Sequence, residues 1–177
     1  KMSGLPHNHI IGSGTILDTA RLRARLAEYF NINQSNVHAY VFGEHGDSSF
    51  IPWSVANVSN VPIKDCHRLI HTPGITNPEL NLEEIEQYVR KSGGRVIARK
   101  GATFYAVSVS VCHICKSIFS GIDTTMTVST MMNGEYGIND VCLSTLNLVG
   151  RNGVRDKINV PLTDEEIGKL RLSAETL

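Results

Sequence analysis

Residues 12–30 read GSGTILDTARLRARLAEYF, and they predict the first long helix of the chain. The glycines precede a helix start at which Thr15 is a suitable N-cap, and Asp18 then lies near the positive end of the helix dipole. Apolar residues follow at helical spacing through the rest of the segment. We therefore expect a helix over about residues 15–30.

Extended segments and helices alternate along the rest of the chain. Residues rich in β-branched, aromatic or other apolar side chains predict extended segments at 37–42, 49–61, 124–132 and 141–149. Apolar residues without strand alternation predict helices at 82–98, interrupted at Gly93-Gly94, at 103–119 and from Thr163 onward. The first two extended segments are expected to pair antiparallel around the loop at 43–48. This mixture predicts the α+β class, with long helices packed on antiparallel strands.

The composition restricts the classes of function. The 177 residues are 41% hydrophobic and 19% charged, and 17 basic residues balance 17 acidic ones. Nothing in this charge draws the protein to nucleic acid or to an anionic membrane surface, and no apolar run approaches the roughly 20 residues that cross a bilayer. We expect a soluble, cytoplasmic protein that binds a small polar ligand, with neither nucleic acid nor a membrane as a partner.

Four cysteines lie in apolar or amphipathic stretches, and we interpret them as reduced thiols: Cys66, Cys112, Cys115 and Cys142. Cys112 and Cys115 have a spacing that some metal sites use, but no second ligand pair accompanies them. Because cysteine behaves as a small hydrophobe, we expect these two in the core on a helix. No metal site is expected.

Two short segments carry residues suited to acid–base chemistry. Asp18 and Arg21 are three positions apart, so a helix presents them on nearly the same face, where they can form an ion pair. The guanidinium of Arg21 can alternatively hold a carboxylate through two parallel hydrogen bonds. His45 lies between Gly43 and Gly46, where a ligand can approach closely. With Asp18 accepting a hydrogen bond from one ring nitrogen of His45, the other nitrogen is presented for proton exchange near neutral pH.

The chain itself lacks a dinucleotide-binding fingerprint. Gly12-Ser13-Gly14 resembles the start of one, but Leu17 stands where the third glycine would be. Lys1 precedes Met2, so we expect the sequence to be part of a longer protein.

Residues 11–21, IGSGTILDTAR, and 43–48, GEHGDS, resemble the C-terminal, substrate-binding half of bacterial-type L-lactate dehydrogenases in the lactate/malate dehydrogenase family. The similarity covers essentially all of residues 1–177. It implies that His45 is the proton donor and acceptor, that Asp18 orients it and that Arg21 binds the substrate carboxylate. Two further residues receive roles from the resemblance: Thr103 lines the substrate pocket and Val107 faces the nicotinamide ring.

The same resemblance implies partners and alternatives. It implies an NAD-dependent homotetramer that interconverts pyruvate and lactate in glycolysis and fermentation, with NAD bound mainly by an N-terminal Rossmann domain outside this chain. The isolated chain is then expected to be inactive. Arg23 and His38 match a pair that binds fructose 1,6-bisphosphate, an allosteric effector, at a subunit interface.

Two alternatives stay open: a malate or other L-2-hydroxy-acid dehydrogenase domain, or a non-catalytic oligomerisation or effector-binding fragment. Gly93-Gly94 stands where many lactate dehydrogenases have a tyrosine, which implies an altered pocket wall.

Overall fold

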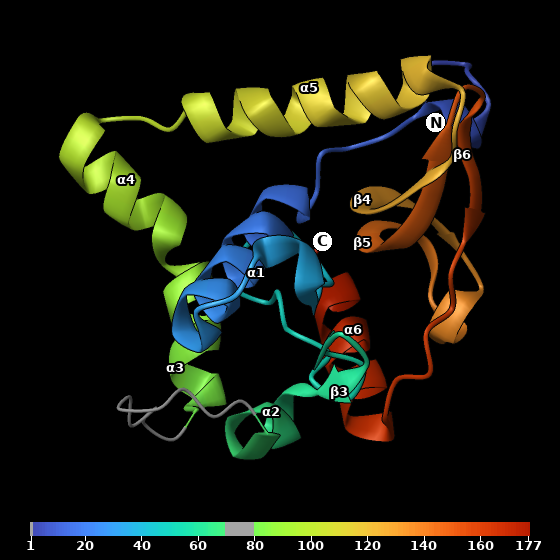
Figure 1. The fold of residues 1–177 in the computed structure, drawn as a ribbon. Helices are drawn as coiled ribbons and strands as arrows, with labels where there is room; N and C mark the ends of the chain where they lie inside the picture. Colours follow the sequence, from blue (N-terminus) through green and yellow to red (C-terminus); the bar gives the residue numbers. More distant parts are fainter. Residues whose placement is uncertain (1, 70–79) are drawn as a thin grey trace.

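Helix α1 (Ile16–Phe30) occupies the centre of the fold, between the helical layer and the larger sheet (Figure 1). The structure is a computed structural model that describes residues 2–69 and 80–177. Leu22, Leu26 and Phe30 of α1 are at most 2% exposed, so one face of the helix lies in the core. The helix ends at Asn31, which adopts the left-handed conformation with φ 52°. The helix predicted over residues 15–30 is confirmed.

The N-cap predicted for α1 is only partly correct. Thr15 stands at the N-cap position, but its side chain accepts no hydrogen bond from the first turn. Its hydroxyl instead donates to the carbonyl of Val41 at 2.5 Å, and its backbone N–H donates to Ser144 Oγ at 3.1 Å. Since Thr15 is fully buried, these bonds satisfy its polar groups and fasten the start of α1 to its neighbours.

The larger sheet is antiparallel and has the order β4-β5-β6. Its strands are β4 (Thr124–Asn133), β5 (Asn139–Gly150) and β6 (Gly153–Lys157), which confirms the extended segments expected at 124–132 and 141–149. A short 3-10 helix, η3 (Glu135–Gly137), joins β4 to β5. Buried side chains from α1, helix α5 (Tyr105–Ser120) and this sheet form one core cluster, so α5 packs against the sheet.

The smaller sheet is much shorter than the sequence predicts. It consists of the two-residue strands β1 (Val37–His38), β2 (Asn57–Val58) and β3 (Val61–Pro62), in antiparallel order β1-β2-β3. Phe42 and Phe50 form an isolated antiparallel bridge around the intervening loop. The expected antiparallel pairing is therefore present, but the expected long strands are wrong.

Side chains of α1 explain why no continuous strand forms after β1. The hydroxyl of Thr19 accepts a hydrogen bond from Val41 N–H at 2.9 Å, and Arg23 Nε donates to the carbonyl of Ala39 at 3.0 Å. These bonds use backbone groups that a strand partner would otherwise pair. The extended segment is thus attached to a helix as well as to a sheet, which an alternation pattern does not reveal.

Three further helices surround α1 (Figure 1): two lie on the side of α1 away from the larger sheet, and one lies below α1 in this view. They are α2 (Ile63–Leu69), α3 (Leu82–Arg90) and α4 (Ser92–Lys100). The break expected at Gly93-Gly94 falls instead at Lys91, and the glycine pair lies inside α4. Neither glycine has a positive φ, because both simply continue the helix.

The last helix, α6 (Asp164–Glu175), begins where the sequence predicts. Thr163 Oγ1 accepts a hydrogen bond from Glu166 N–H at 3.3 Å, and Glu166 Oε2 accepts one from Thr163 N–H at 3.0 Å. This reciprocal pair is a capping box. The other oxygen of Glu166 accepts a bond from Ser54 N–H at 3.0 Å, so the cap also ties α6 to the loop before β2.

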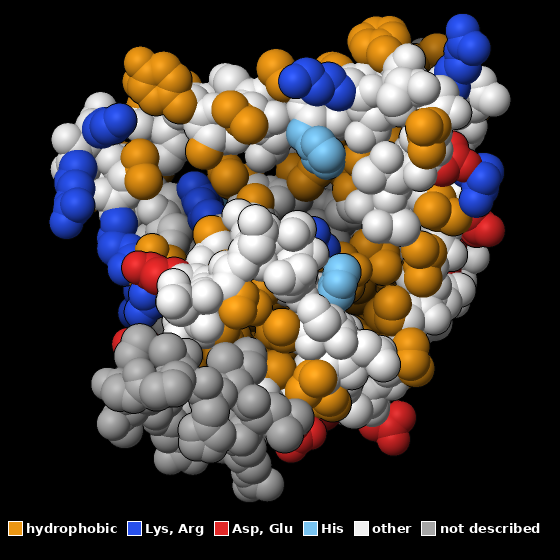
Figure 2. Space-filling view, viewed as in Figure 1, with side chains coloured by type: hydrophobic (Ala, Val, Ile, Leu, Met, Phe, Trp, Pro, Cys, Tyr) orange, Lys and Arg blue, Asp and Glu red, His pale blue; other side chains and the backbone are white. Residues whose placement is uncertain are grey.

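Helix α5 presents an uncovered apolar face. Tyr105, Val109 and Phe119 are 71%, 69% and 85% exposed, and Figure 2 shows apolar side chains along this edge. Cys112 and Cys115 lie on α5 as expected, but both are exposed, so their expected place in the core is wrong. Only part of the apolar surface of α5 is turned toward the sheet. Within residues 2–69 and 80–177, no helix is both long and apolar enough to cross a membrane.

Candidate active site

The loop that carries His45 is fixed at its start by two different elements. Gly43 exchanges two backbone hydrogen bonds of 3.0 Å with Ser144 of β5. Glu44 N–H donates to Ser173 Oγ of α6 at 2.8 Å. Gly43 has φ 95°, and a Cβ at this position would lie 2.5 Å from Ser173 Oγ, so glycine is required here by backbone conformation and by space. The backbone just before His45 is therefore held in a defined position.

The end of the same loop is held by Arg90, which sequence reasoning missed. Arg90 Nη2 donates to the carbonyl of Ser49 at 2.7 Å and to Glu86 Oε1 at 2.9 Å. Ser49 Oγ in turn donates to the carbonyl of Gly46 at 2.8 Å. An arginine in the last turn of a helix is common for dipole reasons alone, so no sequence signal distinguishes this one.

His45 and Asp18 form the closest polar contact of the site. The ring Nδ1 of His45 lies 2.5 Å from Asp18 Oδ2, which leaves Nε2 for a ligand. The carboxylate is buried, with a side chain that is 9% exposed, whereas the side chain of His45 is 59% exposed. The hydrogen bond to Asp18 raises the pKa of His45 above its usual 6.5, and burial and the nearby Arg21 charge oppose this rise only in part.

Arg21 bonds to the same carboxylate. Its Nη1 donates to Asp18 Oδ1 at 3.1 Å, so each oxygen of Asp18 has its own cationic or polarised partner. Asp18 is the only hydrogen-bond acceptor of the Arg21 guanidinium among the described residues, and the guanidinium carries further N–H groups. The two interpretations of this pair can therefore hold together, because Arg21 forms the ion pair with Asp18 and still has N–H groups for the carboxylate of a ligand.

These side chains line one cavity of about 270 Å³, together with others from α3, α4 and α5. Its walls include all five residues expected at the substrate and nicotinamide positions, which are Asp18, Arg21, His45, Thr103 and Val107. Other lining residues were not expected, namely Ser13, Ile16, Ser49, Arg90, Ile97 and Ser110. The cavity combines an imidazole and a guanidinium with apolar residues such as Ile16 and Ile97, which suits a small organic acid. Among the described residues, no cluster of three His, Cys, Asp or Glu side chains is arranged to hold a metal ion.

Thr103 precedes helix α5 in the chain, and Val107 lies within its first turn. Phe104, not Thr103, is the N-cap residue of α5, and no side-chain cap is formed. A helix-capping role for Thr103 is therefore not observed, and its side chain borders the cavity instead. Val107 lies in the first turn of α5 and adds apolar surface to the same cavity.

Arg23 and His38, the residues expected to bind an effector, lie outside this cavity. The guanidinium of Arg23 lies 4.9 Å from the centre of the Tyr40 ring while its Nε bonds to Ala39, next to His38 in the chain. His38 is exposed on the short strand β1. The two residues thus belong to adjoining surface segments.

The amino-acid sequence matches a known protein family over nearly its whole length. The family model described as the lactate/malate dehydrogenase, alpha/beta C-terminal domain matches residues 15–177. The chain belongs to the lactate/malate dehydrogenase family. Among relatives in this family, the L-lactate dehydrogenases of Acetivibrio thermocellus and Bacillus caldolyticus are each 41% identical, over 181 and 177 aligned residues. Each alignment covers 100% of this chain and 55% of the relative, so the chain spans about half the length of these curated proteins.

Solved structures of the lactate/malate dehydrogenase family share the fold. A lactate dehydrogenase from a Medee basin deep-sea metagenome library superimposes with a TM-score of 0.91 and 36% identity, covering 98% of this chain and 55% of that chain. The L-lactate dehydrogenase of Clostridium thermocellum gives a TM-score of 0.87 and 37% identity, with the same coverage. The expected α+β class and the resemblance to a lactate dehydrogenase C-terminal half are both confirmed.

Proposed function

We propose that residues 1–177 form the substrate-binding and proton-transfer half of an NAD-dependent L-lactate dehydrogenase, which interconverts pyruvate and L-lactate. The observation that supports this most strongly is the 2.5 Å contact between His45 Nδ1 and Asp18, beside Arg21 on the wall of one cavity. An imidazole and a guanidinium that share one buried carboxylate are held in fixed positions relative to each other. A 2-oxo acid needs such a pair, one group for its carboxylate and one for its oxygen.

In this proposal, Arg21 receives the substrate carboxylate in its fork and so fixes the orientation of the acid. His45 Nε2 gives a proton to the oxygen of the former carbonyl during reduction and takes it back during oxidation. Asp18 holds the Nδ1–H and stabilises the imidazolium. Because the pKa of His45 is raised, more of it is protonated near neutral pH, which favours its role as the acid.

In the same proposal, the nicotinamide ring lies at the part of the cavity that Thr103 and Val107 line. Val107 would lie against the nicotinamide ring, and Thr103 would border both ring and substrate. NAD, bound mainly by a Rossmann domain outside this chain, supplies the hydride or accepts it. We propose that residues 1–177 alone are inactive for this reason, and that the full-length enzyme is a cytoplasmic homotetramer.

One observation favours a related enzyme with another substrate. Gly93 and Gly94 both line the cavity, and a Cβ at Gly94 would have no atom within 4 Å. This open wall gives room for a side chain larger than the methyl group of lactate. The second candidate is therefore another L-2-hydroxy-acid dehydrogenase, which includes malate dehydrogenase.

A fusion protein tests the activity. The N-terminal part of the Acetivibrio thermocellus relative, which this chain does not cover, is joined to residues 1–177, and NADH oxidation is followed with pyruvate, oxaloacetate and a branched 2-oxo acid. We expect activity that is lost in His45→Gln and Arg21→Gln, and none from residues 1–177 alone. A folded fusion that binds NADH but reduces none of the three acids would contradict the proposal.

We also propose fructose 1,6-bisphosphate as an effector at Arg23 and His38. One guanidinium and one imidazole suit a phosphate, and two-fold pairing of subunits would double the positive charge. Calorimetric titration of residues 1–177 with this compound, followed by size-exclusion chromatography, tests it. Binding that an Arg23→Gln variant loses supports the effector site and would favour the non-catalytic, effector-binding alternative if the fusion protein is inactive.

A further inference from the structure

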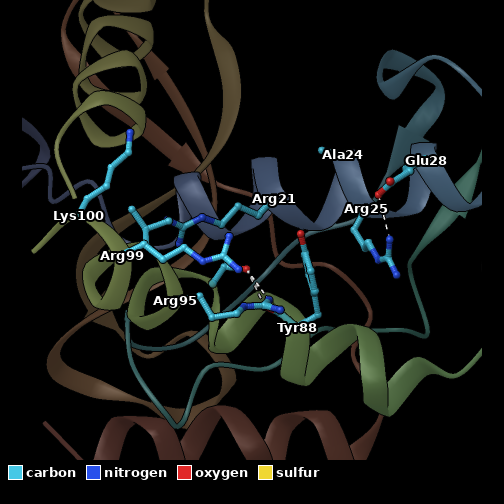
Figure 3. Close-up of a pocket in the computed structure, with 10 residues that line it drawn as sticks. Arg21, Ala24, Arg25, Glu28, Tyr88, Arg95, Arg99 and Lys100 are labelled. Carbon is cyan, nitrogen blue, oxygen red and sulfur yellow. Dashed lines mark hydrogen bonds and ion pairs between the residues drawn. The ribbon is translucent and has the colours of Figure 1, made fainter. Parts of the chain in front are cut away.

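A second and larger cavity lies between α1, α3 and α4 (Figure 3), and it shares Arg21 with the substrate cavity. Its volume is about 770 Å³. Figure 3 shows Arg21, Arg95 and Arg99 gathered on one side of Tyr88, with Arg25 on the other side. Lys100 completes the basic lining at the end of α4. The proposed catalysis uses only Arg21 of this set.

The charges around this cavity are strongly unbalanced. Five of its ten lining residues are basic, and Glu28 is the only acidic one. Glu28 is already paired with Arg25 at 2.9 Å, and its side chain is 70% exposed. In the described part of the chain, Arg95, Arg99 and Lys100 have no acidic partner within ion-pair distance. The cavity therefore has a net positive charge that the fold itself does not neutralise.

Contacts with Tyr88 position these charges without cancelling them. The guanidinium carbons of Arg95 and Arg25 lie 4.1 Å and 5.0 Å from the centre of the Tyr88 ring. Arg95 Nη2 also donates to the carbonyl of Tyr88 at 2.7 Å. Cation–π contacts and bonds to neutral carbonyls orient a guanidinium and leave its full charge in place. Because the guanidinium groups occupy the ring, it does not offer a free face for stacking a base.

The helix dipole explains only part of this cluster. Arg99 and Lys100 lie in the last turn of α4, where cations are favoured in any helix. Arg95 lies in the first half of α4, where the dipole opposes a cation, and Arg25 lies in the middle of another helix. The helix dipole alone therefore does not account for the convergence of cations from two helices on one cavity. Like charges held together repel, and a bound anion offsets that repulsion.

We propose that this cavity binds a small polyanion with at least two phosphate or carboxylate groups. Arginine forks bind both groups in bidentate fashion, and the volume lies in the range of ordinary small-molecule sites, about 300–1,000 Å³. This site is separate from the pair Arg23 and His38, neither of which lines it. It also shares Arg21 with the substrate cavity, so a ligand here contacts the back of the residue proposed to hold the substrate.

Calorimetric titration of residues 1–177 with inorganic pyrophosphate, and separately with citrate, tests the proposal. We expect binding of at least one probe that weakens as salt increases, and at least about tenfold weaker binding in Arg95→Gln and in Arg99→Gln, because each removes a charge-assisted hydrogen bond. All the variants change exposed side chains, so they are expected to fold. The control variant is Lys116→Gln on α5, which removes one positive charge away from the cavity.

Three results would overturn the proposal. The first is no binding of either probe at low salt. The second is equal weakening by Lys116→Gln and Arg99→Gln, which would indicate only a general charge effect. The third is binding that depends on Arg23 and not on Arg99, which would place the anion at the proposed effector pair instead. None of these results depends on catalytic activity, so the outcome is independent of the proposed function.

Discussion

Replacing both glycines of α4 with alanine is expected to stabilise the protein while narrowing the substrate cavity. Gly93 and Gly94 have ordinary helical conformations, so alanine introduces no backbone strain. A Cβ at Gly94 has no atom within 4 Å, and one at Gly93 has Arg21 Nη1 at 3.9 Å, which is a normal contact. The change therefore acts mainly by restricting the unfolded chain.

The expected size follows from these contacts. Each Gly→Ala change at a compatible site stabilises a protein by about 0.4–1 kcal/mol, so the double variant should gain about 1–2 kcal/mol. For a chain of this length, each kcal/mol raises Tm by about 2–4 °C. Urea unfolding followed by circular dichroism measures the free energy, and a thermal scan measures Tm. In the fusion protein, the same variant should lose activity on the branched 2-oxo acid more than on pyruvate.

Gly101 provides a matched control at the end of the same helix. A Cβ there also has no atom within 4 Å, but φ is 78°, so Gly101→Ala should be destabilising. The added methyl groups have room at all three positions, and only Gly101 has a positive φ. A double variant at Gly93 and Gly94 that is less stable than the natural sequence would contradict this prediction, because alanine there is expected to meet neither backbone strain nor a clash.

Three further predictions concern stability. Gly14→Ala should lower the free energy of unfolding by about 2 kcal/mol or more, because φ is 50° and a Cβ would lie 2.7 Å from Ser129 N. A free energy from urea unfolding that lies within roughly 0.5 kcal/mol of that of the natural chain would contradict this prediction. Thr163→Ala should cost about 1 kcal/mol by breaking the capping box, and Thr163→Ser should restore most of it. Because the folded pKa of His45 is raised, its stabilising contribution is fully present below about pH 6.5 and is lost as the pH rises through that raised value. In urea unfolding, His45→Gln should therefore lose more free energy of unfolding, relative to the natural chain, at about pH 6 than at about pH 8. An equal loss at both pH values would contradict this expectation.

Local patterns predicted the parts of the molecule that local physics determines. Helix α1 follows from apolar periodicity, and the start of α6 follows from Thr163 and the acidic residues after it. The placement of Asp18 and Arg21 on one helical face also follows from spacing alone. The chemistry of the side chains suggested that His45 bonds to Asp18, and the family resemblance implied the same pairing, but no local pattern brings together two residues that are 27 positions apart.

Other features depend on contacts between distant segments. The strand expected at 37–42 is reduced to β1 because Thr15, Thr19 and Arg23 bond to the backbone that follows it. Sequence patterns do not show which helix will supply such bonds. The exposure of Cys112 is equally non-local, since the hydrophobicity of α5 does not reveal which of its faces the sheet covers.

The basic cavity could not be predicted for the same reason. Arg25 and Arg95 are 70 positions apart by their numbering, and each is an ordinary surface residue of its own helix. Only the packing of α1 beside α3 and α4 brings them to the same ring of Tyr88. Arg90 is a similar case, because its contact with the carbonyl of Ser49 has no counterpart in local sequence.

The proposed mechanism requires Asp18 to hold His45 as the proton carrier of the site. An NMR titration of the His45 ring in residues 1–177 and in an Asp18→Asn variant tests this requirement, with exposed His38 followed in the same spectra as an internal reference. We predict a His45 pKa above its usual 6.5 in the natural chain and a clearly lower pKa in the variant, because the largest cause of the rise is the hydrogen bond to Asp18. The same His45 pKa in both proteins would contradict the account.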